Sequence, residues 1–415
     1  MTLVSNETPT ETPTAKIEGS THVDPQSINA ERVPDESRAA RMRSFDVADF
    51  SVPNGREEEW RFTPVDRLGG LFADEATAAG DPVTVEVTLP QGVTRATLAQ
   101  GVAPRGSVLV PEDRGAVVAS ANTGEALHLK IPANAEIEEP LRVTLHGNGA
   151  GQRANGHHVL EAGNHSKAIV IVDHTGSADY TGNLEVLVGD GADLTVVTLQ
   201  RWADDANHLA QHEALVGRDA TYKHIAVSLG GAIVRMNSNV RYAGTGGDAT
   251  LLGVYFADAG QHLEHRSFID HNMPKGNSLV TYKGALQGES AHTVWVGDVL
   301  IRAEAEGIDT YELNRNLVLT DGARADSVPN LEIETGDIAG AGHASSTGRF
   351  DDEQLFYLMS RGITEEEARR LVVRGFFADI IAKIRVPEIV DSLMEAIEAE
   401  LALDMSHDYE AGQPA

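Results

Sequence analysis

The segment 327-SVPNLEIETGDIAGAGHASSTGRFDDEQLFYLMSRGITEEEARRLVVRGFF-377 changes from strand-like to helix-like sequence along its length. Its first part has the residues of strands and loops, and its second part has apolar residues at helical spacing. At the join, His343 stands in a run of small residues that allow a backbone or a partner to approach closely. The segment therefore predicts a strand-rich body that ends here and is followed by helices.

Two helices are predicted in the second part of this segment, and a third beyond it. Asp351 is a candidate cap of the first helix, and Gly362 stands where that helix should end. Thr364 and Glu367 form the capping-box pair of the second helix, and Pro387 begins the third. The apolar positions of the last two helices recur at helical spacing: Ala368, Leu371, Val372 and Phe376, then Ile389, Val390, Leu393, Ile397 and Leu401. We expect the third stripe to pack on the body, with a docking face for a partner as the alternative.

Upstream, from Val83 to about Leu319, short runs rich in Val, Leu, Ile and Thr alternate with breaks, and no helix is expected. The breaks contain Gly, Asn or Asp, as in Gly147-Asn148-Gly149, Gly189-Asp190-Gly191 and Gly244-Thr245-Gly246-Gly247. Many strands without helices exclude βαβ architecture. A sandwich or a propeller stays possible, but the span is long for one sandwich and lacks a propeller's strict repeat. A β-helix, in which each turn buries small or branched side chains on the next, fits best.

Composition excludes several classes of function. The chain has 415 residues, with 33 Lys and Arg against 63 Asp and Glu, a formal charge of -30. This charge argues against nucleic acid and anionic membrane as partners, because phosphate binding needs a positive field. There are no cysteines, so the chain cannot hold a conventional iron–sulfur cluster by itself. No apolar run has membrane-spanning length and no secretory signal is recognisable, so we expect a cytoplasmic protein.

Composition also divides the chain. Residues 1–33 are rich in Thr, Glu, Pro and Ser and predict a disordered tail, and Glu36–Phe45 has the spacing of a helix. Trp60 and Phe62 are predicted to anchor the N-terminal segment on the body. The predicted organisation is a tail (1–33), an N-terminal helical segment (34–80), a β-helix core (81–349), a C-terminal helical domain (350–405) and a second tail (406–415).

Ordered motifs in this sequence resemble the SufD subunits of the Suf iron–sulfur cluster assembly system, within the SufB/SufD family. The first group of matches lies around the strand–helix join: Pro329, Leu331-Glu332-Ile333, Asp337, His343, Gly348, Asp351-Asp352-Glu353, Leu355-Phe356-Tyr357-Leu358, Ser360-Arg361-Gly362-Ile363 and Ala368. The second is the run Glu59-Trp60-Arg61-Phe62-Thr63-Pro64, more than 250 residues upstream. Tyr282-Lys283-Gly284 and Trp295-Val296-Gly297 are also SufD-like.

The resemblance implies a mainly β fold, a right-handed parallel β-helix core flanked by N-terminal and C-terminal helical segments. It implies a non-catalytic subunit that pairs with SufB, docks the ATPase SufC and supports de novo cluster assembly, with a homodimer possible in isolation. His343 would be an iron or nascent-cluster ligand shared with a SufB cysteine, and Phe356, Tyr357 and Arg361 would contact SufC. No cofactor is expected to bind tightly to the chain alone, and iron or an iron–sulfur cluster would be held transiently. The chain departs from the family at Ala341, where members often carry a cysteine.

Other candidates remain open at this point. In the run His262-Leu263-Glu264-His265, strand geometry would place His262 and Glu264 on one face and His265 on the other, so polar rungs on the outside of the coil are favoured over a metal site. The pair His157-His158 predicts a solvated loop. The alternative functions are a SufB-like scaffold, which the absence of cysteine disfavours, and a carbohydrate-active β-helix enzyme.

Overall fold

The computed structural model describes residues 41–349 and 352–411, and contacts divide the chain into two units, Met1–Ala40 and Arg41–Ala415. The predicted tail at 1–33, the first part of the predicted helix Glu36–Phe45 and the predicted cap Asp351 lie outside the described residues. Residues 41–45 are described and are not helical.

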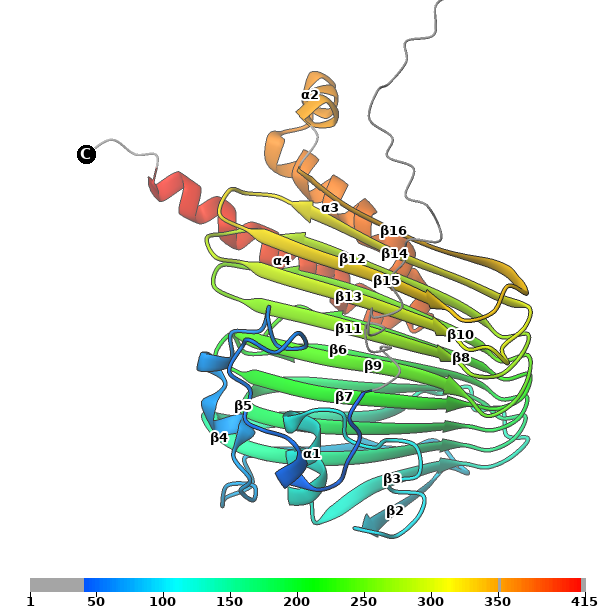
Figure 1. The fold of residues 1–415 in the computed structure, drawn as a ribbon. Coiled ribbons are helices and arrows are strands. Elements are labelled where there is room, and N and C mark those ends of the chain that lie inside the picture. The colour runs from blue at the N-terminus through cyan, green and yellow to red at the C-terminus, as the bar shows by residue number, and fades with distance from the viewer. Residues whose placement is uncertain (1–40, 350–351, 412–415) are drawn as a thin grey trace, which may run out of the picture. The chain divides into compact units, whose positions relative to one another are not determined.

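The described chain is a parallel β-solenoid of about eight turns, so the predicted mainly β class with C-terminal helices is confirmed (Figure 1). The strands are β1 (Val83–Thr88), β2 (Thr94–Ala99), β3 (Glu125–Ile131), β4 (Leu141–Ala162), β5 (Lys167–Val188), β6 (Asp193–Trp202), β7 (Asn207–Val216), β8 (Thr221–Ser228), β9 (Ile233–Tyr242), β10 (Asp248–Ala257), β11 (His262–His271), β12 (Asn277–Leu286), β13 (His292–Ile301), β14 (Ile308–Val318), β15 (Arg324–Ile333) and β16 (Ile338–Arg349).

The long strand β5 joins two ladders of strands. Its first half pairs with β6 and its second half with β7, after which even-numbered strands follow β6 up to β14 and β16, and odd-numbered strands follow β7 up to β13 and β15. All the pairs between β5 and β16 are parallel, which a coil with two long strands per turn produces. Each residue therefore stacks on its equivalent in the turn below.

The inner and outer faces of the coil have different chemistry. In β10, Leu251 and Tyr255 point into the interior core, whereas Leu252 and Phe256 belong to a second apolar cluster outside the coil. The interior is filled to contact, since a Cβ atom on Gly253 would lie 1.9 Å from the ring of Tyr282 in the next turn. Glycine at that position makes room for the aromatic ring.

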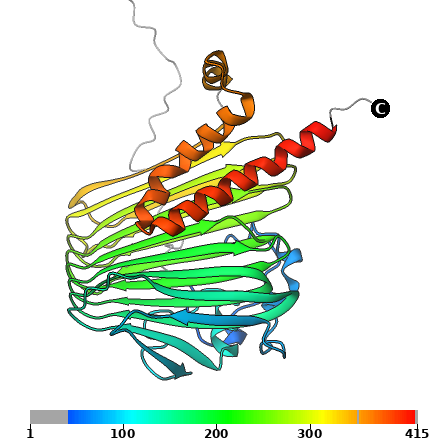
Figure 2. The ribbon, with the colours of Figure 1, turned by 180° about the vertical axis from the view of Figure 1, so that it is seen from behind.

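C-terminal helices cover the apolar outer face of the even-numbered strands (Figure 2). The covering helices are α3 (Glu365–Ile381), the 3-10 helix η4 (Ala382–Ile384) and α4 (Pro387–Ala411), which continues past residue 405, where the second tail was predicted to begin. The helix α2 (Asp352–Ser360) precedes them and packs on α3. Thr364 caps α3 by accepting a hydrogen bond from the backbone of Glu367 at 3.2 Å, as predicted. The α4 stripe is buried as predicted, but in α3 the buried residues include Val373 and Phe377, while Leu371 is 44% exposed. None of the described helices combines the length and the apolarity needed to cross a membrane.

Two features within the strand region correct the sequence-based expectations. The helix α1 (Arg114–Asn122) interrupts a span in which no helix was expected, with Asp113 capping the backbone of Ala116 at 2.9 Å. Its middle residues are small and buried all round, so they show no amphipathic period. The predicted break at Gly147-Asn148-Gly149 does not end the strand, since β4 runs through it, but the pairing of β4 with β5 is interrupted there, between Asn148 and Arg153. A Cβ atom on Gly147 would meet the backbone of Ser177 in β5.

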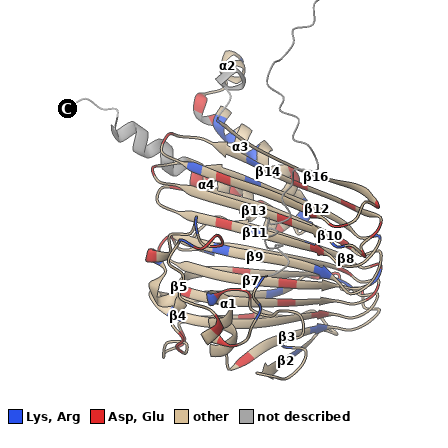
Figure 3. Cartoon of the chain, viewed as in Figure 1, with Lys and Arg blue, Asp and Glu red and all other residues tan. Residues whose placement is uncertain are grey.

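The N-terminal segment lies on the outer face of the odd-numbered strands. Its helices are three short 3-10 helices, η1 (Val47–Asp49), η2 (Val65–Arg67) and η3 (Gly69–Phe72). Trp60 is buried against the edge of the Phe72 ring and beneath the guanidinium of Arg235, so its predicted anchoring role is confirmed. Acidic and basic residues both occur on the strands below (Figure 3).

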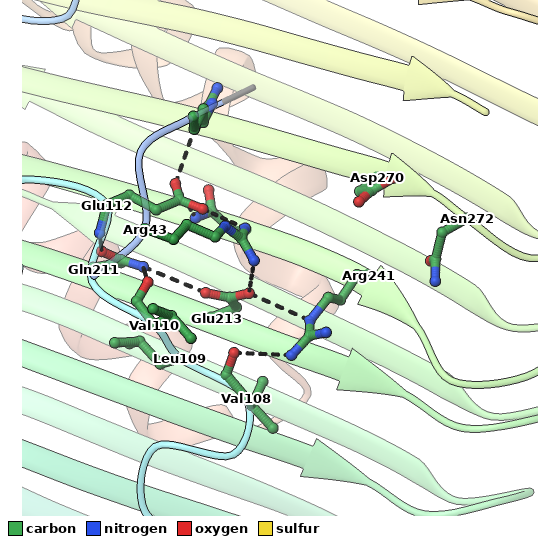
Figure 4. Close-up of polar contacts among 12 residues, drawn as sticks. Arg43, Val108, Leu109, Val110, Glu112, Gln211, Glu213, Arg241, Asp270 and Asn272 are labelled. Atoms are coloured by element: carbon green, nitrogen blue, oxygen red, sulfur yellow. Dashed lines mark hydrogen bonds and ion pairs between the residues drawn. The ribbon is translucent and has the colours of Figure 1, made fainter. Parts of the chain in front are cut away.

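A partly buried charge cluster attaches this segment and the chain before α1 to the sheet (Figure 4). Arg43 forms ion pairs with Glu112 and with Glu213, the latter at 3.4 Å. Arg241 also pairs with Glu213 at 3.4 Å and donates a hydrogen bond to the carbonyl of Val108 at 3.0 Å. Burial raises the pKa of Glu213 to about 7, although the charges of Arg43 and Arg241 favour the ionised carboxylate.

Candidate functional site at the open end of the coil

The last turn of the coil has no further turn above it. In the described chain β15 pairs only with β13 and β16 pairs only with β14, so each has one free edge of backbone N–H and C=O groups. Such edges are ready to pair with another strand. Nothing in the described chain stacks on the inward-facing side chains of the last turn, so they are half-buried, as Leu331 and Ala341 are, or exposed, as His343 is.

His343 belongs to this inward-facing row. It is paired in parallel register with Glu312 of β14, and Ala341 with Thr310. Because Thr310 and Glu312 are buried while Tyr311 between them is 44% exposed, the first two point into the coil. Paired residues on neighbouring strands share a face, so His343 points the same way, and it is exposed. The structure therefore places the predicted ligand histidine at the mouth of the coil, accessible to a docked partner.

Glu312, directly beneath His343, is the residue that sequence reasoning missed. Its side chain lies inside the coil, where a Cβ atom on Gly297 would come within 2.8 Å of Glu312 Oε1. It is 1% exposed, and neither carboxylate oxygen has a hydrogen-bond partner among the described residues. Burial, and after it the charge of Asp298, raises the pKa of Glu312 to about 8. At neutral pH it is therefore mainly a carboxylic acid, one strand below the imidazole.

A polar network holds the rest of this row. Asn314 donates hydrogen bonds to the hydroxyl of Tyr255 at 2.8 Å and to the carbonyl of Tyr282 at 3.2 Å. Asn316 donates to Asn314 at 2.8 Å, and Ser327 of β15 also donates to Asn314. The network joins both ladders and fixes the mouth of the coil. One signal in the sequence could have pointed to Glu312. Every second residue in the middle of β14 is polar, and these polar residues are the ones that face inward.

The predicted SufC-contacting residues lie elsewhere, on α2 and just after it. Phe356 is 74% exposed and Tyr357 56%, and the guanidinium of Arg361 lies 5.0 Å from the Tyr357 ring centroid. Met359 and Leu371 add exposed apolar surface nearby in sequence. Within the described chain α2 packs on α3, so this apolar surface stands out from the body (Figures 1 and 2).

The other histidine motifs are resolved by the strands. His262 and Glu264 do share one face, with His262 Nε2 3.1 Å from Glu264 Oε2, while His265 points inward and stacks on Tyr255. The predicted solvated loop at His157-His158 is wrong, since both residues lie in β4. His157 is buried with its Nε2 2.6 Å from Glu185, and burial lowers the pKa of His158 to about 3. His158 and His265 therefore face the interior of the coil, whereas His157 lies on its outer face, where Glu185 also accepts hydrogen bonds from the backbone of the chain before α1.

The mouth of the coil offers few side chains that could bind a metal ion. The described residues contain no group of three or more His, Asp or Glu side chains that could hold a metal ion. His343 therefore offers a single nitrogen, with Glu312 beneath it, and the remaining ligands of any bound iron would come from another molecule. Neutral imidazole suits iron and other first-row metals, whereas iron–sulfur clusters require mainly thiolates.

Comparison with known proteins identifies the group to which these features correspond. Residues 145–376 match the family model described as SUF system FeS cluster assembly, SufBD core domain. An iron–sulfur cluster assembly SufBD family protein of Mycobacterium bovis is 54% identical over 369 residues, 88% of this chain and 93% of that protein. The iron–sulfur cluster assembly protein SufD of Bacillus subtilis is 27% identical over 303 residues, 71% of this chain and 68% of that protein. SufD of Escherichia coli is 26% identical over 266 residues, 62% of each chain.

Proposed function

Since the chain belongs to the SufBD family of iron–sulfur cluster assembly proteins, we propose that it acts as a SufD-type subunit of a Suf complex, without catalytic activity of its own. The observation that carries this proposal is the open end of the coil, where an exposed histidine stands in a chain that has no cysteine. Such an end offers one nitrogen ligand and a docking surface. It does not offer the thiolates that a cluster scaffold needs.

The proposed partner at this end is SufB. The free edges of β15 and β16 supply unpaired backbone groups, and the last inward row supplies side chains that a facing coil would cover. A SufB cysteine brought to His343 would complete a mixed nitrogen and sulfur site. Iron and the nascent cluster are then cargo, held transiently between the two subunits. In isolation the same edges would favour a homodimer.

The proposed partner at the other exposed surface is the ATPase SufC. Phe356, Tyr357 and Met359 place apolar side chains in water on α2, and exposed apolar surface of this kind marks protein contacts. Arg361 over the Tyr357 ring adds a charged group at its border. Because α3 and α4 are packed on the even-numbered strands, movement of a docked ATPase would be transmitted to the coil.

The experiment that tests this is co-expression of the chain with SufB and SufC and measurement of cluster content. We expect His343→Ala to fold and to retain SufC while cluster assembly falls, because the only change is the loss of an exposed ligand. His146→Ala, at another exposed histidine, is the matched control and should leave assembly unchanged. Phe356→Ala should show the reverse pattern, with SufC lost from the purified complex. A normal cluster yield in His343→Ala would remove His343 from the mechanism.

A further inference from the structure

Two histidines from neighbouring strands converge on the outer face of the odd-numbered ladder. His262 is the first residue of β11 and His292 the first of β13, and they are paired in register. Their Nδ1 atoms lie 3.1 Å apart, with ring centroids 4.8 Å apart and ring planes at 67°. This face is the one that the N-terminal segment covers, because Thr63 donates a hydrogen bond to Glu264 two residues along β11 at 2.6 Å.

The opposite nitrogen of each ring is oriented by a carboxylate. His262 Nε2 lies 3.1 Å from Glu264 Oε2, and His292 Nε2 lies 2.7 Å from Asp326 Oδ2. Glu264 also accepts a hydrogen bond from Arg266 at 3.2 Å and Asp326 one from Arg324 at 3.0 Å, and a carboxylate paired in this way can only accept hydrogen bonds. Each Nε2 consequently carries the proton.

The tautomer that these contacts fix leaves a lone pair on each Nδ1 atom. Two lone pairs 3.1 Å apart repel unless a positive centre lies between them. That centre is either a shared proton or a metal ion. Carboxylates that orient the far nitrogens of histidine ligands are the usual outer shell of protein metal sites. The side chain of His292 is 21% exposed and that of His262 2%, so an ion could enter from the His292 side.

We propose that His262 and His292 bind one divalent first-row transition-metal ion, of the zinc and cobalt class, through their Nδ1 atoms. Imidazole suits these metals, and water would fill the remaining positions, because the described residues supply no third ligand. Glu264 and Asp326 are positioning residues, already paired with arginines, and not ligands. The ion would link β11 to β13 and, through Glu264, to the N-terminal segment. This site is separate from the mouth of the coil and does not rest on the proposed function.

The test is titration of tag-free, metal-stripped full-length chain with Co²⁺, followed by visible absorption and competition with Zn²⁺. The wild type should bind one equivalent of Co²⁺ with ligand-field bands of nitrogen coordination. His292→Asn should lose that equivalent, with affinity reduced at least tenfold, while His146→Asn and His343→Asn retain it. Asp326→Asn keeps both histidine ligands but removes the carboxylate that orients the His292 ring. It should therefore weaken Co²⁺ binding by roughly 10- to 100-fold.

Circular dichroism and thermal melting of metal-free His292→Asn would show that the fold is kept. Asp326→Asn, whose side chain is near the surface, provides the second measurement if His292→Asn melts early. Equal Co²⁺ binding by the wild type and His292→Asn, or no binding by the wild type, would overturn the inference and leave a shared proton between the rings. Loss of cluster assembly in His343→Asn with Co²⁺ binding intact would separate this site from the proposed function.

Discussion

Replacing Glu312 by Gln should stabilise the protein at neutral pH and not at acidic pH. Glu312 is enclosed in the last turns of the coil without a hydrogen-bond partner among the described residues, and burial raises its pKa to about 8 from an ordinary value of 4.5. A carboxyl group whose pKa is raised on folding costs nothing below its unfolded pKa. Its cost grows as the pH rises from 4.5 towards 8, because the unfolded chain gains by ionising and the folded chain does not.

The magnitude follows from the pKa difference. Each pH unit is worth about 1.4 kcal/mol, so the roughly 2.5 units between the ordinary pKa and pH 7 amount to about 3 kcal/mol. At pH 5 the same reasoning gives less than about 1 kcal/mol. Glutamine has nearly the same shape and does not ionise, so Glu312→Gln should recover most of this difference. The expected result is a gain in the free energy of unfolding that is large at pH 7 and small at pH 5.

The assay is urea unfolding followed by circular dichroism at pH 5, 6 and 7, on the wild type, Glu312→Gln and Glu86→Gln. Glu86 is an exposed glutamate on β1, so the same chemical change there should alter stability little at any of these pH values. If the stability of Glu312→Gln varied with pH as steeply as that of the wild type, Glu312 would not be the buried acid described above.

Two further predictions concern packing. Gly253→Ala should destabilise the coil by about 1 to 3 kcal/mol, because its Cβ would lie 1.9 Å from the Tyr282 ring. The measurement is urea unfolding, with Gly260→Ala as the comparison. At Gly260 a Cβ meets no atom within 4 Å but the backbone is left-handed, so the comparison separates the steric cost from the backbone cost. Leu393→Ala, at a fully buried position of α4, should lower the free energy of unfolding by about 2 to 5 kcal/mol. In limited proteolysis of this variant, α3 and α4 should be cut before the coil. Equal protection of the helices and the coil would contradict the packing described.

The class of fold could be predicted because its evidence is local. Alternating branched and polar residues, breaks at Gly189-Asp190-Gly191 and capping at Thr364 are all properties of neighbouring residues, and the structure has them where they were expected. The helix α1 and the continuous strand through Gly147 were missed because their cause is not local. The middle residues of α1 are small and buried on all sides, and Gly147 lies against the backbone of Ser177 in a different strand.

The site shows the same division. His343 was found through its motif, and its exposure at the open end agrees with that reading, while its role as a ligand stays a prediction. Glu312 was not found, because a glutamate among 63 acidic residues carries no signal until the coil encloses it. His292 was likewise passed over, since 30 residues of chain separate it from the histidine that it meets in space.

The sequence by itself determined that this chain is rich in strands and ends in helices, with a stacked coil as the best fit, and that it contains no cysteine thiolate. Those properties follow from residue type and spacing, which act over a few positions along the chain. Only the tertiary structure decided which side chains stack in the same row of successive turns. In a parallel coil that row is set by register, so residues about 30 positions apart, such as Glu312 and His343, become neighbours on one face.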